Sequence, residues 1–335
     1  MSIDVISLLI GCAVALVGAM LVTGFVLWLM RRWQRLVAPS ERGAHSVPMP
    51  TAGGLGIIVG FLMGHAVMGF DLSIYWLGAV ALILVAVADD LVRPLKVWEK
   101  TLLLVVATSV FLMGIIPDYD GWFGFVDVES SIWLWPLGIC WFFWVCNVFN
   151  FMDGIDGISS TQTILVAGWM AIYLESFDVE LAGRAWLLGA ASGGFLFFNF
   201  SPARIFMGDV GSIFIGFVVA ALVVLGMQVG VPIWYAIFLL GYYLFDTSYA
   251  LVRRLLNGEN LLLAHNKHLY QRLVRIGWSH GLVDLWAGTL TLLNGLGIFC
   301  IAHELYEIGI GILIASLLIL LYTAFWVERK DACFA

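Results

Sequence analysis

Acidic residues interrupt the most apolar stretches of the chain at three points, and their carboxylates are the first candidates for chemistry. The three points are Asp89-Asp90, Asp153 with Asp156, and Asp209. Only 12% of the 335 residues are charged, and a carboxylate at the edge of an apolar run is energetically costly, which makes it a candidate functional residue. Carboxylates that converge on one face would suit a divalent cation and a phosphate-bearing substrate, because Mg²⁺ prefers oxygen ligands.

Two of these acidic clusters also allow a structural interpretation. Adjacent carboxylates at Asp89 and Asp90 repel each other, so they predict a raised pKa for one of them or a shared cation; two solvated acids are the alternative. The stretch 147–157 contains two Asp-Gly steps, which are typical of a turn. It also holds two amides and two acids that can donate to and accept from a polar ligand: Asn147, Asn150, Asp153 and Asp156.

Three further segments contain side chains that could bind a polar ligand. The segment 42–54 has two prolines that stop helix formation and a glycine pair that allows close backbone approach; a stiff turn is the alternative. The segment 199–212 places Asp209 among glycines, with an aromatic residue upstream. The segment 265–272 combines two histidines with Lys and Arg, which suits phosphate binding. The candidates in these segments are Arg42, His45, Asn199, Phe206, Asp209, His265, His268 and Arg272.

The overall composition excludes a soluble globular protein. Hydrophobic residues make up 62% of the chain and the mean hydropathy is +1.00, whereas average proteins are about half apolar and about one quarter charged. Apolar runs of about 17–25 residues can cross ~30 Å of hydrocarbon as helices. They predict one all-α integral membrane domain over 1–335, with about eleven spans near 5–30, 52–70, 73–88, 101–116, 131–149, 157–174, 184–198, 210–227, 231–252, 281–302 and 308–327.

The basic residues predict the orientation of these spans. Every Lys and Arg except Arg184 falls in one set of alternate loops. By the positive-inside rule this set is cytoplasmic, which places the N-terminus outside and the C-terminus in the cytoplasm. The candidate residues lie in the same loops. The site is therefore expected at the cytoplasmic face, near 31–54, 88–100, 147–157, 199–212 and 253–280.

In these five segments the chain resembles the polyprenyl-phosphate N-acetylhexosamine-1-phosphate transferase superfamily (glycosyltransferase family 4). The most specific motifs are Asp89-Asp90, Asn150-Phe-Met-Asp153-Gly-Ile-Asp156-Gly, and Phe206-Met-Gly-Asp209-Val-Gly-Ser. The segment Ala264-His265-Asn-Lys267-His268-Leu-Tyr270-Gln271-Arg272 resembles the branch that starts O-antigen and similar surface glycans. It lacks the consecutive histidines of the branch that makes the peptidoglycan precursor, which argues against a muramyl-pentapeptide substrate.

The resemblance implies a reaction and its partners. A sugar-1-phosphate would move from a UDP-N-acetylhexosamine to a polyprenyl phosphate, undecaprenyl phosphate in a bacterium, with release of UMP. The cofactor would be Mg²⁺, with Mn²⁺ as a substitute, and a two-step route through an Asp nucleophile stays open beside direct transfer. The expected location is the inner (plasma) membrane with the site facing the cytoplasm. A homodimer is common in related enzymes, and no nucleic-acid partner is expected.

The resemblance also implies a role for each candidate residue. Asp209 would be the main Mg²⁺ ligand with Asp90 in support, and Asp89 would be the base that deprotonates the lipid phosphate. On the nucleotide side, Asn150 would bind substrate and Phe206 would stack on the uracil. The remaining assignments are Asp153, Asp156 and Asn199 to the uridine, His265, His268 and Arg272 to the diphosphate or the sugar, and Arg42 and His45 to the nucleotide sugar.

Two questions stay open in the sequence. Asp246, inside the predicted span 231–252, also fits the family pattern and would either tie helices together or belong to the site. The function also has an alternative, an ion-coupled membrane transporter in which the acids form a relay. Transporter sites lie near the bilayer midplane, whereas these acids cluster at one face, so the transferase is the favoured prediction.

Overall fold

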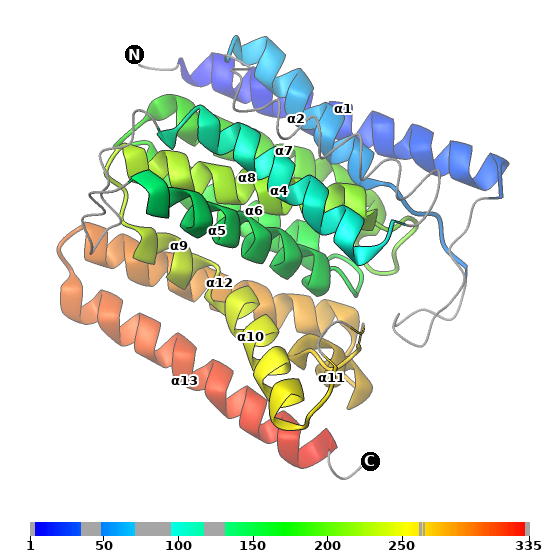
Figure 1. The fold of residues 1–335 in the computed structure, drawn as a ribbon. Coiled ribbons are helices and arrows are strands. Elements are labelled where there is room, and N and C mark those ends of the chain that lie inside the picture. The colour runs from blue at the N-terminus through cyan, green and yellow to red at the C-terminus, as the bar shows by residue number, and fades with distance from the viewer. Residues whose placement is uncertain are drawn as a thin grey trace.

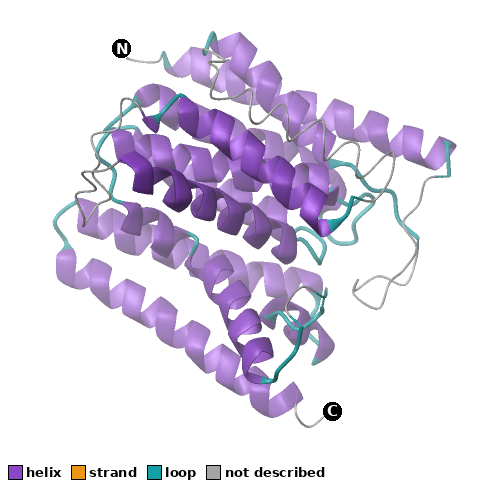
Figure 2. Cartoon of the chain, in the orientation of Figure 1, coloured by secondary structure: helices purple, strands orange, loops and turns teal. Residues whose placement is uncertain are grey.

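The computed structural model describes residues 4–34, 48–70, 95–116, 131–260, 263 and 265–331. These residues form helices joined by loops, with no strand among them (Figure 2). Figure 1 labels the helices. Their bounds are α1 Val5–Arg32, α2 Gly54–Met68, α4 Val97–Met113, α5 Ser131–Met152, α6 Ile158–Leu174, α7 Val179–Asn199, α8 Gly208–Gln228, α9 Ile233–Leu239, α10 Gly241–Leu256, α11 Leu269–Arg275, α12 His280–Ala302 and α13 Tyr306–Asp331.

The helical fold class is confirmed, and each predicted span except 73–88 coincides with a described helix or helix pair. The span 73–88 lies outside the described residues. By length and composition, six of the described helices can cross a membrane, or seven if the bent pair α9 and α10 counts as one span. The number eleven and the orientation of the termini therefore stay predictions. The short helix α11 was not expected from the sequence.

The helices pack as a bundle in which α8 is the most enclosed candidate span. α8 packs against α5 and α2, while α1 packs against α2 and α7, and α12 against α13. In Figure 1, α1 and α13 lie on opposite sides of the bundle. Both keep large apolar side chains exposed, such as Val5 and Tyr322, each 68% exposed. Apolar side chains facing outward suit contact with lipid, since hydrocarbon does not penalise them.

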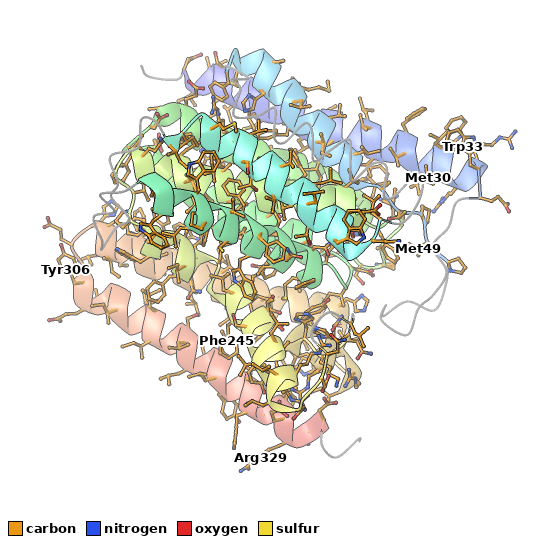
Figure 3. All side chains as sticks on the ribbon, in the orientation of Figure 1. Met30, Trp33, Met49, Phe245, Tyr306 and Arg329 are labelled. Atoms are coloured by element: carbon orange, nitrogen blue, oxygen red, sulfur yellow. The ribbon has the colours of Figure 1, made fainter. Side chains whose placement is uncertain are left out.

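The described parts of the candidate segments gather at one end of the bundle. The start of α2 contacts the loop between α7 and α8 through Gly53 and Phe206, and the start of α4 and the end of α5 contact Asp209 at the start of α8. Figure 3 shows Trp33 and Met49 at this end and Tyr306, at the start of α13, at the other. We call the end marked by Trp33 and Met49 the site end.

The span predicted at 231–252 is broken into two helices. The axes of α9 and α10 differ by 72° across the break at Leu240. A break frees backbone groups that need another partner inside an apolar bundle. Asn294 of α12 supplies one, because its Nδ2 donates to the carbonyl oxygen of Phe238 at 2.9 Å. The break directs α10 away from α9 and toward the loop that carries the histidines (Figure 1).

The glycine pair before α2 makes the close backbone approach that the sequence predicts. The amides of Gly53 and Gly54 donate to the carbonyl oxygens of Phe206 and Met207, both at 2.9 Å. A Cβ at Gly54 would stand 2.2 Å from Cα of Gly211 in α8. Any side chain there would collide with backbone, which cannot move aside as a flexible side chain can. The pair therefore fixes the loop before α8 against the start of α2.

We expect Gly54→Ala to destabilise the protein by about 1–3 kcal/mol, because the added methyl overpacks the contact between α2 and α8. Thermal unfolding in detergent measures this. Gly168→Ala is the matched control, since a Cβ at Gly168 would lie 3.8 Å from the ring of Trp186 with no closer neighbour. In the control, the better helix propensity of alanine should leave stability unchanged or slightly raised. Equal effects of the two changes would contradict the packing argument.

Candidate active site

Asp209 is the centre of the polar residues at the site end. It stands in the first turn of α8, where the helix dipole favours a negative charge. Its Oδ2 pairs with Nζ of Lys100 from α4 at 2.5 Å, and its Oδ1 accepts from Nδ2 of Asn150 from α5 at 2.9 Å. The same Asn150 nitrogen lies 3.0 Å from the hydroxyl of Ser212. Two other helices thus place polar side chains on one carboxylate, which keeps 29% of its side-chain surface exposed.

Lys100 is the residue that sequence reasoning missed. It counted only as one of the basic residues that set the orientation, yet its Nζ pairs with Oδ2 of Asp209 at 2.5 Å. A signal was available, because Lys100 lies inside the first turn of an apolar helix, within the segment that holds Asp89-Asp90. A lysine at that position is costly unless it has a partner.

The oxygen atoms at Asp209 and Ser212 are of the kind that bind a hard divalent cation. The carboxylate oxygens and the hydroxyl of Ser212 are oxygen ligands of the kind that Mg²⁺ binds. The ammonium of Lys100 already stands beside Oδ2, so the position attracts positive charge. Among the described residues no group of three or more His, Cys, Asp or Glu side chains could hold a metal. The predicted second ligand, Asp90, lies outside the described residues, as does Asp89.

Asp156 and Asn199 join the loop after α5 to the loop after α7. The amide of Gly157 donates to Oδ1 of Asn199 at 3.0 Å, and Nδ2 of Asn199 donates to the carbonyl oxygen of Ile205 at 3.0 Å. Oδ2 of Asp156 accepts from the amide of Ala203 at 3.1 Å. Both side chains are buried, at 5% and 4% exposure. These two predicted uridine ligands therefore hold the two loops in register.

Two other predicted nucleotide ligands, Phe206 and Asp153, lie half-buried on the same loops. The amide of Phe206 donates to the carbonyl oxygen of Pro50 at 2.9 Å, so its backbone is fixed from both sides by the segment before α2. Asp153 lies close to Tyr270: burial, followed by the charges of Asp246 and Asp153, raises the pKa of the Tyr270 hydroxyl. Asp153 thus lies near the segment 265–272, which we call the histidine loop, as well as in the loop after α5.

His268 contacts the end of α5 through ring packing. Its ring lies 6.1 Å from the ring of Phe151, 4.7 Å from that of His265 and 5.8 Å from that of Tyr270. The hydroxyl of Tyr270 donates to the carbonyl oxygen of Phe151 at 3.0 Å. The histidine loop and the loop after α5 are therefore brought together, although more than a hundred residues separate them.

His265 is neutral at pH 7. Burial, followed by the charges of His268, Arg254 and Lys267, lowers the pKa of His265 to about 4. Its Nδ1 accepts from the amide of Lys267 at 3.2 Å, while Nζ of Lys267 pairs with Glu259 at 2.6 Å. The charge that this loop offers to an anion at pH 7 therefore does not come from His265.

Arg272 is anchored to α13. Its Nη1 and Nη2 bind the two carboxylate oxygens of Glu328 at 2.6 and 2.9 Å, and its Nε binds Oδ2 of Asp331 at 2.7 Å. The side chain is 1% exposed. The structure does not bring it to Asp209. Its predicted contact with the diphosphate or the sugar stays a prediction, as do the roles of Arg42 and His45, which lie outside the described residues.

The sequence is similar to known membrane transferases. The family described as Glycosyl transferase family 4 matches residues 72–227. A probable undecaprenyl-phosphate N-acetylglucosaminyl 1-phosphate transferase of Bacillus subtilis (strain 168) is 28% identical over 82% of this chain and 79% of its own. A phospho-N-acetylmuramoyl-pentapeptide-transferase of Synechococcus sp. (strain JA-2-3B'a(2-13)) is 30% identical over 84% of this chain and 88% of its own. The chain belongs to the polyprenyl-phosphate hexosamine-1-phosphate transferase superfamily.

Membership of this transferase superfamily bears on two predictions. The apolar helices and these relatives indicate that the chain is an integral membrane protein. The alternative of an ion-coupled transporter is not favoured, because the relatives are sugar-1-phosphate transferases.

We expect Lys100→Gln to strengthen binding of Mn²⁺ at Asp209 by up to about fivefold, because the ammonium competes for a partly exposed carboxylate. Titration of the purified protein followed by electron paramagnetic resonance measures this affinity. Lys330→Gln, at the exposed end of α13, is the control for loss of one positive charge. The gain should disappear in an Asp209→Asn background. Unchanged Mn²⁺ affinity in Lys100→Gln would show that the two cations do not share the carboxylate.

We expect acid to destabilise the protein in part through His265. The unfolded chain binds a proton near the ordinary histidine pKa of 6.5, whereas the folded chain does so only near 4. Stability therefore falls as the pH drops from 6.5 toward 4 and does not change above that window through this group. Because the ring is half-exposed, the expected loss between about pH 7.5 and about pH 5 is about 1 kcal/mol.

Thermal unfolding at these two pH values measures the effect. His265→Asn keeps an acceptor near the position of Nδ1 and should lose less stability on acidification than the parent protein. His303→Asn, an exposed histidine at the opposite end of the bundle, should behave like the parent. The same acid sensitivity in all three proteins would contradict the argument.

Proposed function

We propose that the protein transfers an N-acetylhexosamine-1-phosphate from a UDP-sugar to a polyprenyl phosphate at the cytoplasmic face of the inner membrane. The observation that carries the proposal is the Asp209 carboxylate, which stands at the head of the most enclosed helix with Lys100 and Asn150 on it. Phosphoryl transfer depends on positioning and charge neutralisation more than on covalent chemistry by the protein. A fixed carboxylate beside a fixed ammonium supplies both.

The bonds change as follows in the proposed reaction. An oxygen of the lipid phosphate forms a bond to the β-phosphorus of the UDP-sugar. The bond from that phosphorus to the bridging oxygen of the α-phosphate breaks, and the electron pair leaves with UMP. The product is a lipid pyrophosphate that carries the sugar. Negative charge accumulates on the phosphoryl oxygens during this exchange, so fixed positive charge at those oxygens stabilises the transition state.

The residues around Asp209 have distinct tasks in this proposal. Asp209, with Asp90, would hold Mg²⁺ or Mn²⁺, which neutralises charge on the diphosphate when bound. Asn150 keeps the Asp209 carboxylate oriented by its hydrogen bond to Oδ1. Lys100 would offer its ammonium to the phosphate oxygens when a cation is bound at the carboxylate of Asp209. Asp89 is the proposed base for the proton of the lipid phosphate.

The nucleotide would lie against the loops that follow α5 and α7. Asp153, Asp156 and Asn199 are the proposed uridine contacts, with the ring of Phe206 on the uracil. The Gly157 amide donates to Asn199 and the Ala203 amide donates to Asp156, and these hydrogen bonds hold the two loops together before substrate binds. They support the proposal, because prior ordering lowers the entropy cost of binding. The proposed diphosphate or sugar contacts are His265, His268, Arg272, Arg42 and His45.

We propose the surface-glycan branch for the biological role, in which the product starts an O-antigen or a similar lipid-linked glycan. The support is the segment from His265 to Arg272, which lacks the consecutive histidines of the branch that makes the peptidoglycan precursor. The relatives include both an N-acetylglucosaminyl and an N-acetylmuramoyl-pentapeptide transferase, so the two names differ in the sugar group that is transferred. A homodimer is part of the proposal on family grounds alone.

Release of UMP tests the function directly. Purified protein with polyprenyl phosphate, Mg²⁺ and a panel of UDP-N-acetylhexosamines should release UMP only when lipid and metal are both present. Asp209→Asn should lower this turnover by about 10²–10³-fold with its melting temperature retained, and Asp178→Asn, at the other end of the bundle, should not. Full Mg²⁺-dependent activity of Asp209→Asn would reject the assignment of Asp209. No release with any donor from folded protein would reject the function.

A further inference from the structure

Asp246 makes three hydrogen bonds to the histidine loop from inside α10. Its side chain is fully buried, at 0% exposure. Oδ1 accepts from the amide of Leu269 at 2.8 Å and lies 3.2 Å from Nδ1 of His268, while Oδ2 accepts from the amide of Tyr270 at 3.0 Å. The two amides belong to the first turn of α11, so one carboxylate caps that helix and contacts the histidine that precedes it.

This arrangement determines which nitrogen of His268 carries the proton. Both oxygens of Asp246 already accept from backbone amides, so the contact between Oδ1 and Nδ1 is a hydrogen bond in which Nδ1 donates. A neutral ring protonated on Nδ1 presents Nε2 as an acceptor. Among the described residues His268 has no hydrogen-bond partner at Nε2. The rings of His265, Tyr270 and Phe151 pack around it and limit its rotation.

We propose that Asp246 is a positioning residue that acts through His268: it fixes the Nδ1–H tautomer and the ring orientation, so that Nε2 accepts a hydrogen bond from a hydroxyl or amide N–H of the donor sugar. The proposal rests on the proposed transferase function for the identity of the ligand. It gives a physical reason for a carboxylate buried in the bundle, which is energetically costly unless its partners satisfy it.

The bend between α9 and α10 explains how a residue of the bundle reaches the loop. α10 leaves the direction of α9 by 72°, and Asp246 lies in its second turn. In Figure 1, α10 lies beside α11 as a consequence, and the two helices are in contact. A straight helix in place of the pair would not bring Asp246 to the amides of α11.

A purely structural role, in which Asp246 only caps α11, makes different predictions. Asp246→Ala removes the acceptor beside Nδ1 of His268, so the Nδ1–H tautomer loses the hydrogen bond that fixes it and the ring adopts the Nε2–H tautomer that an unpartnered neutral imidazole prefers. Nε2 then becomes a donor. Asp178→Ala is the matched control, because Asp178 also caps a helix, α7, through the amide of Leu181 at 2.9 Å, with no histidine involved.

Nitrogen NMR of ¹⁵N-histidine-labelled protein in detergent tests the tautomer without any assay of activity. The signal of His268 is assigned by its loss in His268→Asn. We expect the Nδ1–H tautomer in the parent protein and in Asp178→Ala, and the Nε2–H tautomer in Asp246→Ala. An Nε2–H tautomer in the parent protein overturns the proposal even if Asp246→Ala fails to fold.

A double-mutant cycle on UMP release tests the coupling. Asp246→Ala should lower kcat/KM for the UDP-sugar by about 10–100-fold, the usual cost of losing the partner that orients a histidine. In a His268→Asn background the same change should cost less than about twofold, because the two residues act as one unit. An equal loss in both backgrounds means that Asp246 only caps α11. Absence of UMP release from the parent protein would reject the transferase function, while the NMR result would still decide the role of Asp246.

Discussion

The charge of Asp209 at the start of α8 constrains the rest of the site. A carboxylate at the head of the most enclosed helix of an apolar bundle is tolerated only if it is paired, and the pairing comes from two other helices. Lys100 of α4 supplies the opposite charge and Asn150 of α5 supplies a hydrogen bond. The hydrogen bonds from the amides of Gly53 and Gly54 to the loop before α8 hold that loop against the start of α2. The rigid frame and the reactive group are therefore parts of the same network.

The histidine loop is held from two directions by buried charge. Asp246 binds it from α10, and Glu328 with Asp331 bind Arg272 from the end of α13. A guanidinium that is 1% exposed would be strongly destabilising without partners, and here all of its nitrogens have one. Arg253 also pairs with Glu328, at 2.9 Å. The last helix of the chain thus contributes to the order of a loop that the sequence links only to substrate.

Several polar residues of the family motifs stabilise the site as well as face it. The side chains of Asn199 and Asp156 form hydrogen bonds with the backbone of neighbouring loops. Substitution of such a residue removes a loop contact along with any substrate contact, so loss of activity alone does not show that it binds uridine. The pair of Asp246 and His268 raises the same question, and a tautomer is a readout that separates the two roles.

Sequence alone determined the long apolar helices, although not the break between α9 and α10 or the short helix α11, and it grouped the candidate residues in one set of loops. Length and composition of the apolar runs located the helices within a few residues, because an apolar helix needs no distant partner to satisfy its backbone. The placement of Lys and Arg gathered the candidate residues into one set of loops. Tertiary structure decided which of them touch. The contact of Lys100 with Asp209, the attachment of Arg272 to α13 and the bend that turns Asp246 toward His268 all join residues far apart in the chain. No local pattern encodes such contacts, because each depends on how whole helices pack against one another.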